Sequence, residues 1–152
     1  MLKKIAVISI AACLALVAAG YVAYRANTAP VTPPISAAEA SNPSRPFVVK
    51  LHARWCHLCL ITTSVWSHIE QEYSGRVNFL VLDFTDDQTT DASRAAAERV
   101  GLGRIFEESG STGVVLIVYG RTKAVTASIA GSRDFAEYRA AIGAVLNHNR
   151  SR

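Results

Sequence analysis

Cys56 and Cys59 lie three residues apart in the segment RWCHLCL, with Trp55 immediately before them and His57 between them. Thiols at this spacing can exchange electrons as a dithiol and a disulfide, bind part of a metal site, or form a fixed structural cross-link. A loop of three residues removes little entropy from the unfolded chain, so a purely structural cross-link adds little stability. The spacing therefore favours redox exchange or metal binding.

The elements around the pair determine what the two sulfurs can do. Residues 47–53 are predicted to form a strand, and recurring apolar residues predict a helix from about Cys56 to Tyr73. Cys56 then stands at the helix N-terminus, where free N–H groups and the helix dipole stabilise a thiolate, and a protonated His57 adds to this effect. Cys59 lies one turn further on the same face and can close a disulfide. We expect Cys56 to be the exposed attacking nucleophile and Cys59 to resolve the mixed disulfide.

The rest of the folded part alternates between strands and helices. The predicted elements are a strand at 76–84, a helix at 91–100, a helical turn at 105–108, strands at 114–119 and 124–129, and a last helix from Ser132 or Asp134. Acidic residues between the second strand and its helix are expected to cap that helix. A strand–helix–strand opening requires a parallel pair, and the later hairpin adds an antiparallel edge. The predicted fold class is α/β, a three-layer α/β/α arrangement around a mixed central sheet.

The N-terminal region has the features of a membrane segment. Ile5–Tyr24 contains no charged residue and follows the basic pair Lys3–Lys4. About 20 apolar residues are enough to cross a bilayer as a helix. We therefore expect residues 1–25 to form a transmembrane anchor with its N-terminus in the cytoplasm. The alternatives are a cleaved signal, with its cleavage site before Gly20, and a lipoprotein signal ending at Cys13.

Between this segment and the folded part, residues 26–45 are rich in Pro, Ala and Ser and contain no aromatic residue. They are predicted to form a flexible linker, and the domain then spans residues 46–152. The whole chain has a net charge of +4, but residues 46–152 contain 12 Lys and Arg against 11 Asp and Glu, a net of +1. Such a balance gives no electrostatic reason to expect a nucleic acid partner. The expected location is the inner membrane, with a single pass and the domain facing the periplasm.

From roughly Pro46 to Leu146 the sequence resembles the thioredoxin superfamily. The resemblance rests on the segment FVVKLHARWCHLC at residues 47–59, on the strand at 77–83, on the late hairpin, and on Gly131 before the last helix. With the apolar N-terminal segment included, the chain looks most like membrane-tethered, exported thioredoxin-like proteins. The resemblance implies exchange of dithiol and disulfide with protein substrates, through Cys56 and Cys59 with Trp55 beside them. It also implies an upstream redox donor or acceptor, and no cofactor is expected.

Two substitutions near the cysteines depart from the family pattern. The family places a buried acid six residues before the first cysteine, and here that position is Lys50. A buried lysine tends to lose its charge and can act as a base, whereas a lysine that extends its amine to the surface keeps the charge. The family's proline between the cysteines is replaced by Leu58, next to His57. This second change is expected to alter the redox equilibrium of the pair.

A third departure concerns the loop that faces the cysteines. The family has a cis-proline there, but residues 110–115, GSTGVV, contain no proline. Because a cis bond before a residue other than proline costs about 2.5–4 kcal/mol, we expect this loop to be trans and shaped by Gly113. Thr112 and Gly113 are the expected substitutes for the family's substrate-docking loop.

Two other functions remain open from the sequence. Cys56, Cys59 and His57, with His52 nearby, are residue types that bind zinc or copper, so the domain can also be read as a metal-transfer module. No second pair of cysteines completes a structural zinc set in the folded part, and His52 fits a packed core residue, so no resident metal site is expected. The third reading is a non-catalytic adaptor, which the missing proline favours and the two cysteines oppose.

Overall fold

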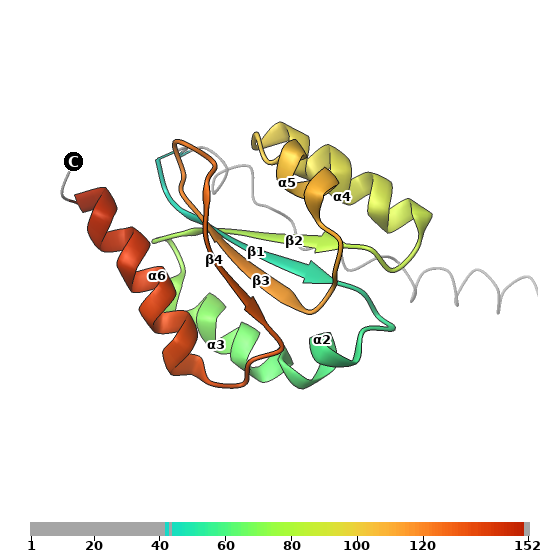
Figure 1. Ribbon diagram of the computed structural model, residues 1–152, viewed down its shortest axis with the longest axis horizontal. Helices are drawn as coiled ribbons and strands as arrows, with labels where there is room; N and C mark the ends of the chain where they lie inside the picture. The colour runs from blue at the N-terminus through green and yellow to red at the C-terminus, as the bar shows by residue number, and fades with distance from the viewer. Residues whose placement is uncertain (1–41, 43, 151–152) are drawn as a thin grey trace, which may run out of the picture. The chain divides into compact units, whose positions relative to one another are not determined.

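The computed structural model describes residue 42 and residues 44–150 of the chain (Figure 1). The predicted anchor at 1–25 and all but the last few residues of the predicted linker lie outside these described residues. None of the helices in the described part is long and apolar enough to span a bilayer.

Four strands form one mixed sheet in the order β2-β1-β3-β4. Their bounds are β1 Phe47–His52, β2 Asn78–Asp83, β3 Val114–Val118 and β4 Val125–Ala130. β1 pairs in parallel with β2 and antiparallel with β3, and β4 pairs antiparallel with β3. The predicted parallel pair and antiparallel edge are therefore both confirmed, and β1, which leads into the cysteines, is a central strand.

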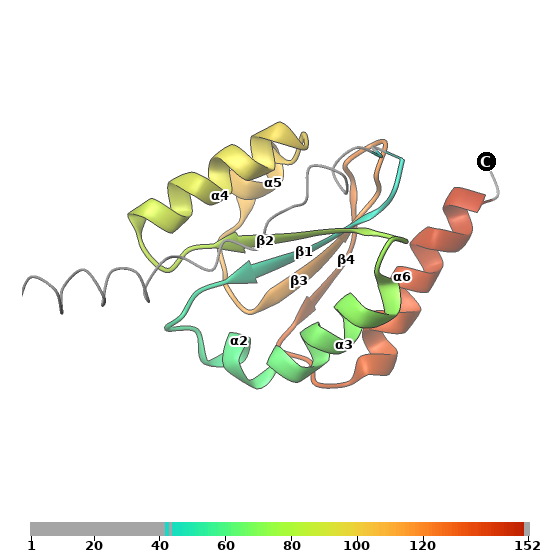
Figure 2. The ribbon, with the colours of Figure 1, turned by 180° about the vertical axis from the view of Figure 1, so that it is seen from behind.

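Helices cover both faces of this sheet (Figures 1 and 2). Their bounds are α2 His57–Ile61, α3 Thr63–Tyr73, α4 Asp87–Arg99, α5 Gly103–Glu108 and α6 Phe135–Arg150. α4 and α5 lie on one face, and α2, α3 and α6 lie on the other. Apolar side chains of β1 alternate between the two: Val48 packs with Trp66 and Ile142 on one side, whereas Val49 packs with Leu102 on the other. The three-layer prediction is confirmed for the described domain.

Helix boundaries differ from the prediction where polar side chains bond to the backbone. The expected helix from Cys56 to Tyr73 is two helices, broken at Thr62. Thr62 Oγ1 donates to the carbonyl of Leu58 at 2.8 Å, and Thr63 Oγ1 donates to the carbonyl of Cys59 at 3.1 Å. Hydroxyls that occupy these carbonyls compete with the helical ladder and allow it to bend.

α4 begins four residues earlier than predicted. The Asp86 carboxylate accepts from Thr89 N–H at 2.9 Å, and Thr89 Oγ1 accepts from Asp86 N–H at 3.1 Å. This reciprocal capping box satisfies two N–H groups that the helix cannot, and so it fixes the start of the helix. The expected capping role of this acidic segment is confirmed for Asp86.

The described chain begins with a turn fixed to the start of the sheet. Asn78, the first residue of β2, pairs with Phe47 at the start of β1 and is almost fully buried. Its side-chain N–H group donates to the carbonyls of Asn42 and Arg45, each at 3.2 Å. The end of the predicted linker is therefore held at the edge of the sheet where β1 and β2 begin.

Candidate functional site

The cysteine pair follows the other end of β1. Cys56 N–H donates to the carbonyl of Ala53 at 3.1 Å, which closes a turn directly after the strand. Cys56 is the N-cap of α2, and its Sγ accepts from Cys59 N–H at 3.1 Å. The two cysteines are joined by a disulfide with Cα atoms 5.3 Å apart. The predicted position at a helix N-terminus is confirmed, and the N–H aimed at Cys56 Sγ is one that can stabilise a thiolate.

The disulfide is more covered than expected. Cys59 is fully buried and Cys56 is 6% exposed, so the expectation of an exposed Cys56 is wrong, although Cys56 remains the more accessible of the two. Both sulfurs pack with Ala53 in a small buried cluster. Cys59 Sγ also lies 3.7 Å from the carbonyl oxygen of Leu51. An incoming thiol must therefore reach Cys56, and Cys59 is shielded.

Gly113 forms part of this cover. Its φ of 81° lies in the left-handed region, and residues 42 and 44–150 contain no cis peptide bond, so the prediction of a trans loop shaped by Gly113 is confirmed. Gly113 N–H donates to the Leu51 carbonyl at 2.8 Å, and its own carbonyl accepts from Gly131 N–H at 3.0 Å. A Cβ atom on Gly113 would lie 3.2 Å from Cys56 Sγ. The loop thus lies against Cys56 with no room for a side chain at position 113, and Thr112 precedes this contact.

Trp55 is 67% exposed, and its indole is directed to the β2–α4 loop. Its Nε1 donates to the carbonyl of Thr85 at 3.3 Å. Arg54 N–H donates to Thr85 Oγ1 at 2.9 Å, and the Arg54 guanidinium forms an ion pair with Asp86 at 3.2 Å. The Thr85 hydroxyl in turn donates to the Asp83 carboxylate. Thr85 therefore positions the loop before the cysteines, a role that the sequence pattern did not indicate.

Lys50 lies on β1 facing α3. The residue is 8% exposed, and its Nζ lies 5.2 Å from the centre of the Trp66 ring. Burial lowers the pKa of Lys50, and the nearby carboxylate of Glu70 acts in the opposite direction. The structure therefore places the Lys50 side chain almost wholly inside the domain, with its amine over an aromatic ring.

His52 is the next residue on the same face of β1 and pairs with Asp83 of β2. Its Nδ1 is buried and has no hydrogen-bond partner within the described part of the chain. Burial and then the charge of Lys50 lower the pKa of His52, whereas Asp83 raises it. His52 is therefore not a fully satisfied core residue.

His57 is exposed on the first turn of α2. Within residues 42 and 44–150, no three His, Cys, Asp or Glu side chains are placed together so that they can hold one metal ion. The geometry therefore adds nothing to the metal-transfer reading of Cys56, Cys59 and His57.

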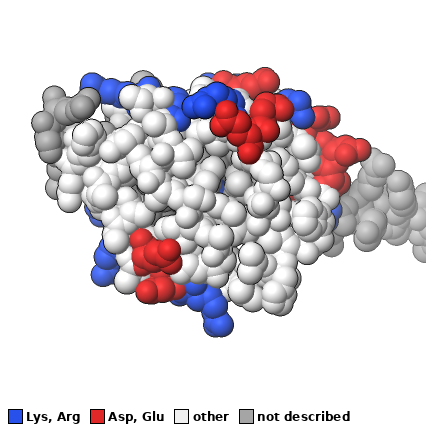
Figure 3. Space-filling model, in the orientation of Figure 1, with Lys and Arg blue, Asp and Glu red and all other residues white. Residues whose placement is uncertain are grey.

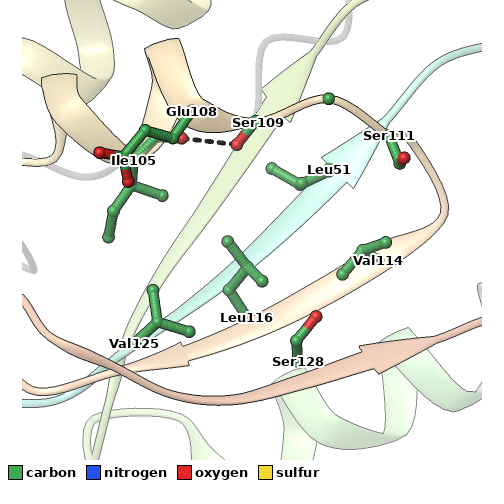
Figure 4. Close-up of a pocket in the computed structure, with 10 residues that line it drawn as sticks. Leu51, Ile105, Glu108, Ser109, Ser111, Val114, Leu116, Val125 and Ser128 are labelled. Carbon is green, nitrogen blue, oxygen red and sulfur yellow. Dashed lines mark hydrogen bonds between the residues drawn. The ribbon is translucent and has the colours of Figure 1, made fainter.

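The surface around the sheet also contains a groove. In the view of Figure 3, charged side chains gather over α4 and α5, while the middle of this face is uncharged. A hollow of about 330 Å³ lies between α5, β3 and β4, and its lining includes Leu51, Val114, Leu116, Val125 and Glu108. Figure 4 shows these side chains around the hollow. Neither cysteine lines it.

Comparisons with known proteins give one family match and several similar solved structures. Residues 35–99 match the family model described as Thioredoxin. No curated protein matches the chain. Similar solved structures include dsbF of MTB, determined in mixed oxidized and reduced forms, at 15% identity and a TM-score of 0.49, covering 67% of this chain and 81% of that one. A thioredoxin from Malassezia sympodialis is 16% identical with a TM-score of 0.45, and the match covers 68% of this chain and 79% of that one. Trxlp from Edwardsiella tarda is 15% identical with a TM-score of 0.44, and the match covers 66% of this chain and 82% of that one.

Proposed function

Because the chain belongs to the thioredoxin superfamily, we propose that it is a thiol–disulfide oxidoreductase acting on protein substrates through Cys56 and Cys59. The observation that carries the proposal is the geometry of the pair. Cys56 caps α2 and receives the Cys59 N–H, the two form a disulfide, and Cys59 is the more buried sulfur. This arrangement gives the two sulfurs different roles.

The exchange runs in two displacements at sulfur. A substrate thiolate attacks Cys56 Sγ, a substrate–Cys56 disulfide forms, and the bond to Cys59 breaks so that Cys59 leaves as a thiolate. A second substrate thiolate then attacks the substrate sulfur of the mixed disulfide and releases Cys56 as a thiolate. The substrate has lost two electrons and the Cys56–Cys59 pair has gained them. In the reverse direction Cys56 attacks a substrate disulfide and Cys59 resolves the intermediate.

Docking of the substrate chain is assigned to the loop at Thr112 and Gly113. Both backbone groups of Gly113 are already bonded, to Leu51 and Gly131. The N–H and carbonyl of Thr112, in contrast, make no hydrogen bond to the described residues, and Thr112 is only half-buried. Thr112 can therefore pair with the backbone of an extended substrate next to its cysteine.

The decisive experiment uses the full chain in a glutathione redox series, with free thiols trapped at each step. We expect a reversible two-electron transition that Cys56→Ser abolishes. Cys59→Ser should accumulate a mixed disulfide between Cys56 and a model substrate, because the resolving sulfur is missing. A wild-type chain whose cysteines never cycle, or whose Cys56→Ser variant still exchanges disulfides, contradicts the proposal.

We also propose that the domain is held at the inner membrane and faces the periplasm, where it meets exported proteins and its redox donor or acceptor. Support comes from the uncharged segment Ile5–Tyr24 after Lys3–Lys4. Fractionation of cells should recover the full chain with the membranes after carbonate extraction, and periplasmic protease should remove the domain. Recovery in the soluble fraction contradicts anchoring and leaves the redox proposal untouched.

A further inference from the structure

Two basic side chains flank the peptide that touches the buried sulfur, and the exchange reaction described above gives neither of them a role. Lys50 and His52 lie two residues apart on β1 and therefore point to the same face of the sheet. Leu51, between them, places its carbonyl oxygen 3.7 Å from Cys59 Sγ. The pair is thus built into the strand that supports the disulfide.

Lys50 is an unusual residue for its position. Four polar or charged residues of the described part are buried, namely Lys50, Thr62, Asn78 and Ser93, and Lys50 is the charged one among them. Its neighbours across the sheet are Val81 and Val115, and its amine lies over the Trp66 ring. No ion pair within 4 Å joins it to a carboxylate of the described residues. A cation at this position lacks a close counter-charge.

His52 is a second basic residue on this face that lacks a partner for one of its polar atoms. Its buried Nδ1 has no partner among the residues described. Asp83, opposite it on β2, already accepts hydrogen bonds from the N–H and the hydroxyl of Thr85. The charged groups that reach this face are therefore Asp83 from β2 and Glu70 from α3, and neither forms an ion pair with the basic residues.

We propose that Lys50 and His52 form a basic pair that stabilises the reduced state of Cys56 and Cys59, so that the protein acts as an oxidant of substrate dithiols. This inference rests on the thiol–disulfide exchange proposed above and adds the direction in which electrons flow between the substrate and this protein. When a substrate dithiol is oxidised, a substrate disulfide forms, the Cys56–Cys59 bond breaks, and two electrons and two protons are transferred. One sulfur keeps its negative charge as a thiolate near the Lys50 cation, and the proton that this sulfur would otherwise take is bound by the His52 imidazole, whose Nδ1 has no partner among the described residues.

The physical reason is that the disulfide is neutral and a thiolate is not. With the disulfide closed, a protonated Lys50 carries the cost of burial with no carboxylate of the described residues within ion-pair distance, in keeping with its lowered pKa. Reduction creates an anion beside the same strand, and the attraction between opposite charges is large in a partly buried setting. The basic pair therefore favours the dithiol form, and the electrons flow from substrate to this protein. A more oxidising disulfide protein is the class of acceptor that restores the disulfide.

The test measures the equilibrium between the full chain and glutathione for the wild type, Lys50→Met, His52→Phe and Lys123→Met. Lys123→Met is a matched control: Lys123 is also partly buried over an aromatic ring, that of Phe47, but at the start of β1. Removing the buried charge should shift the equilibrium of Lys50→Met toward the disulfide about tenfold, and His52→Phe should shift it in the same direction by a smaller factor. Lys123→Met should match the wild type.

A second readout does not depend on the folding of any variant. Thiolate absorbance of the reduced wild-type chain should show one cysteine ionising well below the ordinary cysteine pKa of about 8.5. If Lys50→Met and His52→Phe fold and keep the wild-type equilibrium, or if the wild-type thiols stay protonated up to that pH, the basic pair does not set the direction. A wild-type chain with no reversible glutathione equilibrium instead removes the proposed function itself, so the two failures are distinguishable.

Discussion

Gly113 lies directly against Leu58: a Cβ atom added to Gly113 would be 2.6 Å from the Cβ atom of Leu58. Gly131 borders the same side chain, and its added Cβ atom would be 2.9 Å from Leu58 Cδ2. Two glycines from separate loops thus make room for the residue that stands between the cysteines. The cover over the disulfide is a fitted contact among three residues, and it explains why Cys56 is nearly buried.

Gly113→Ala should destabilise the domain by about 1–3 kcal/mol, because alanine is strained at a φ of 81° and its Cβ would overlap Leu58. The substitution should also slow exchange, since the loop must move away from Cys56. Urea unfolding and turnover with a model disulfide measure the two effects. Gly110→Ala is the control, because Gly110 is in the same loop and a Cβ there meets nothing within 4 Å. Equal stability of the two variants would show that the close contact is unimportant.

Leu58→Ala should expose Cys56 and raise the rate of disulfide reduction by dithiothreitol several-fold. The side chain packs against Gly131 and against Gly113, which lies beside the Cys56 sulfur, and alanine is too short to fill that space. Stopped-flow reduction followed by thiol release measures the rate. Leu60→Ala, on the same short helix but 60% exposed, should keep the wild-type rate. An unchanged rate in Leu58→Ala means that the approach to Cys56 is limited by another group.

Thr85→Val should loosen the loop that leads into the cysteines. The hydroxyl accepts from Arg54 N–H and donates to Asp83, and losing both bonds should cost about 1–2 kcal/mol of unfolding free energy. We also expect a raised KM for protein substrates, because Trp55 is held by the carbonyl of the same residue. Thr85→Ser retains the hydroxyl and should restore both values. If serine and valine behave alike, the methyl group matters and the hydroxyl does not.

Stability should depend on pH through His52. Burial and Lys50 lower its pKa below the ordinary 6.5, so the folded state binds this proton less readily than the unfolded state. Stability from this residue is therefore complete above pH 6.5 and is lost as the pH falls toward the folded-state pKa. Unfolding free energies between about pH 7.5 and pH 5 should fall less steeply in His52→Phe than in the wild type.

The sequence was sufficient to predict the strands and helices that carry the cysteines. Apolar runs and helical periodicity are local signals, and the order of elements restricts how a parallel pair and a hairpin can be connected. The break at Thr62 was not predicted because a threonine hydroxyl that bonds to the preceding turn leaves no mark in the apolar pattern. The early start of α4 had a signal in the Asp86–Thr89 spacing, but threonine is a less common partner in a capping box than glutamate.

Some features of the candidate site could be predicted from the sequence, and others could not. Cys56, Cys59 and Gly113 are recognisable from motif spacing and from the need for a positive φ. Thr85 is not, because its bond to Arg54 joins residues 31 positions apart and depends on the pairing of β1 with β2. The burial of Cys56 was also missed, since the contact of Gly113 with Leu58 depends on how two loops meet at the ends of the strands.

The turn that Asn78 holds in place and the disulfide lie at opposite ends of β1. Asn42 and Arg45 are fixed where β1 begins, whereas the disulfide follows the end of the same strand, and six extended residues span about 20 Å. The described chain therefore enters the domain at the opposite end of β1 from Cys56. A label attached at Asn42 should therefore leave the approach of an incoming thiol to Cys56 unobstructed.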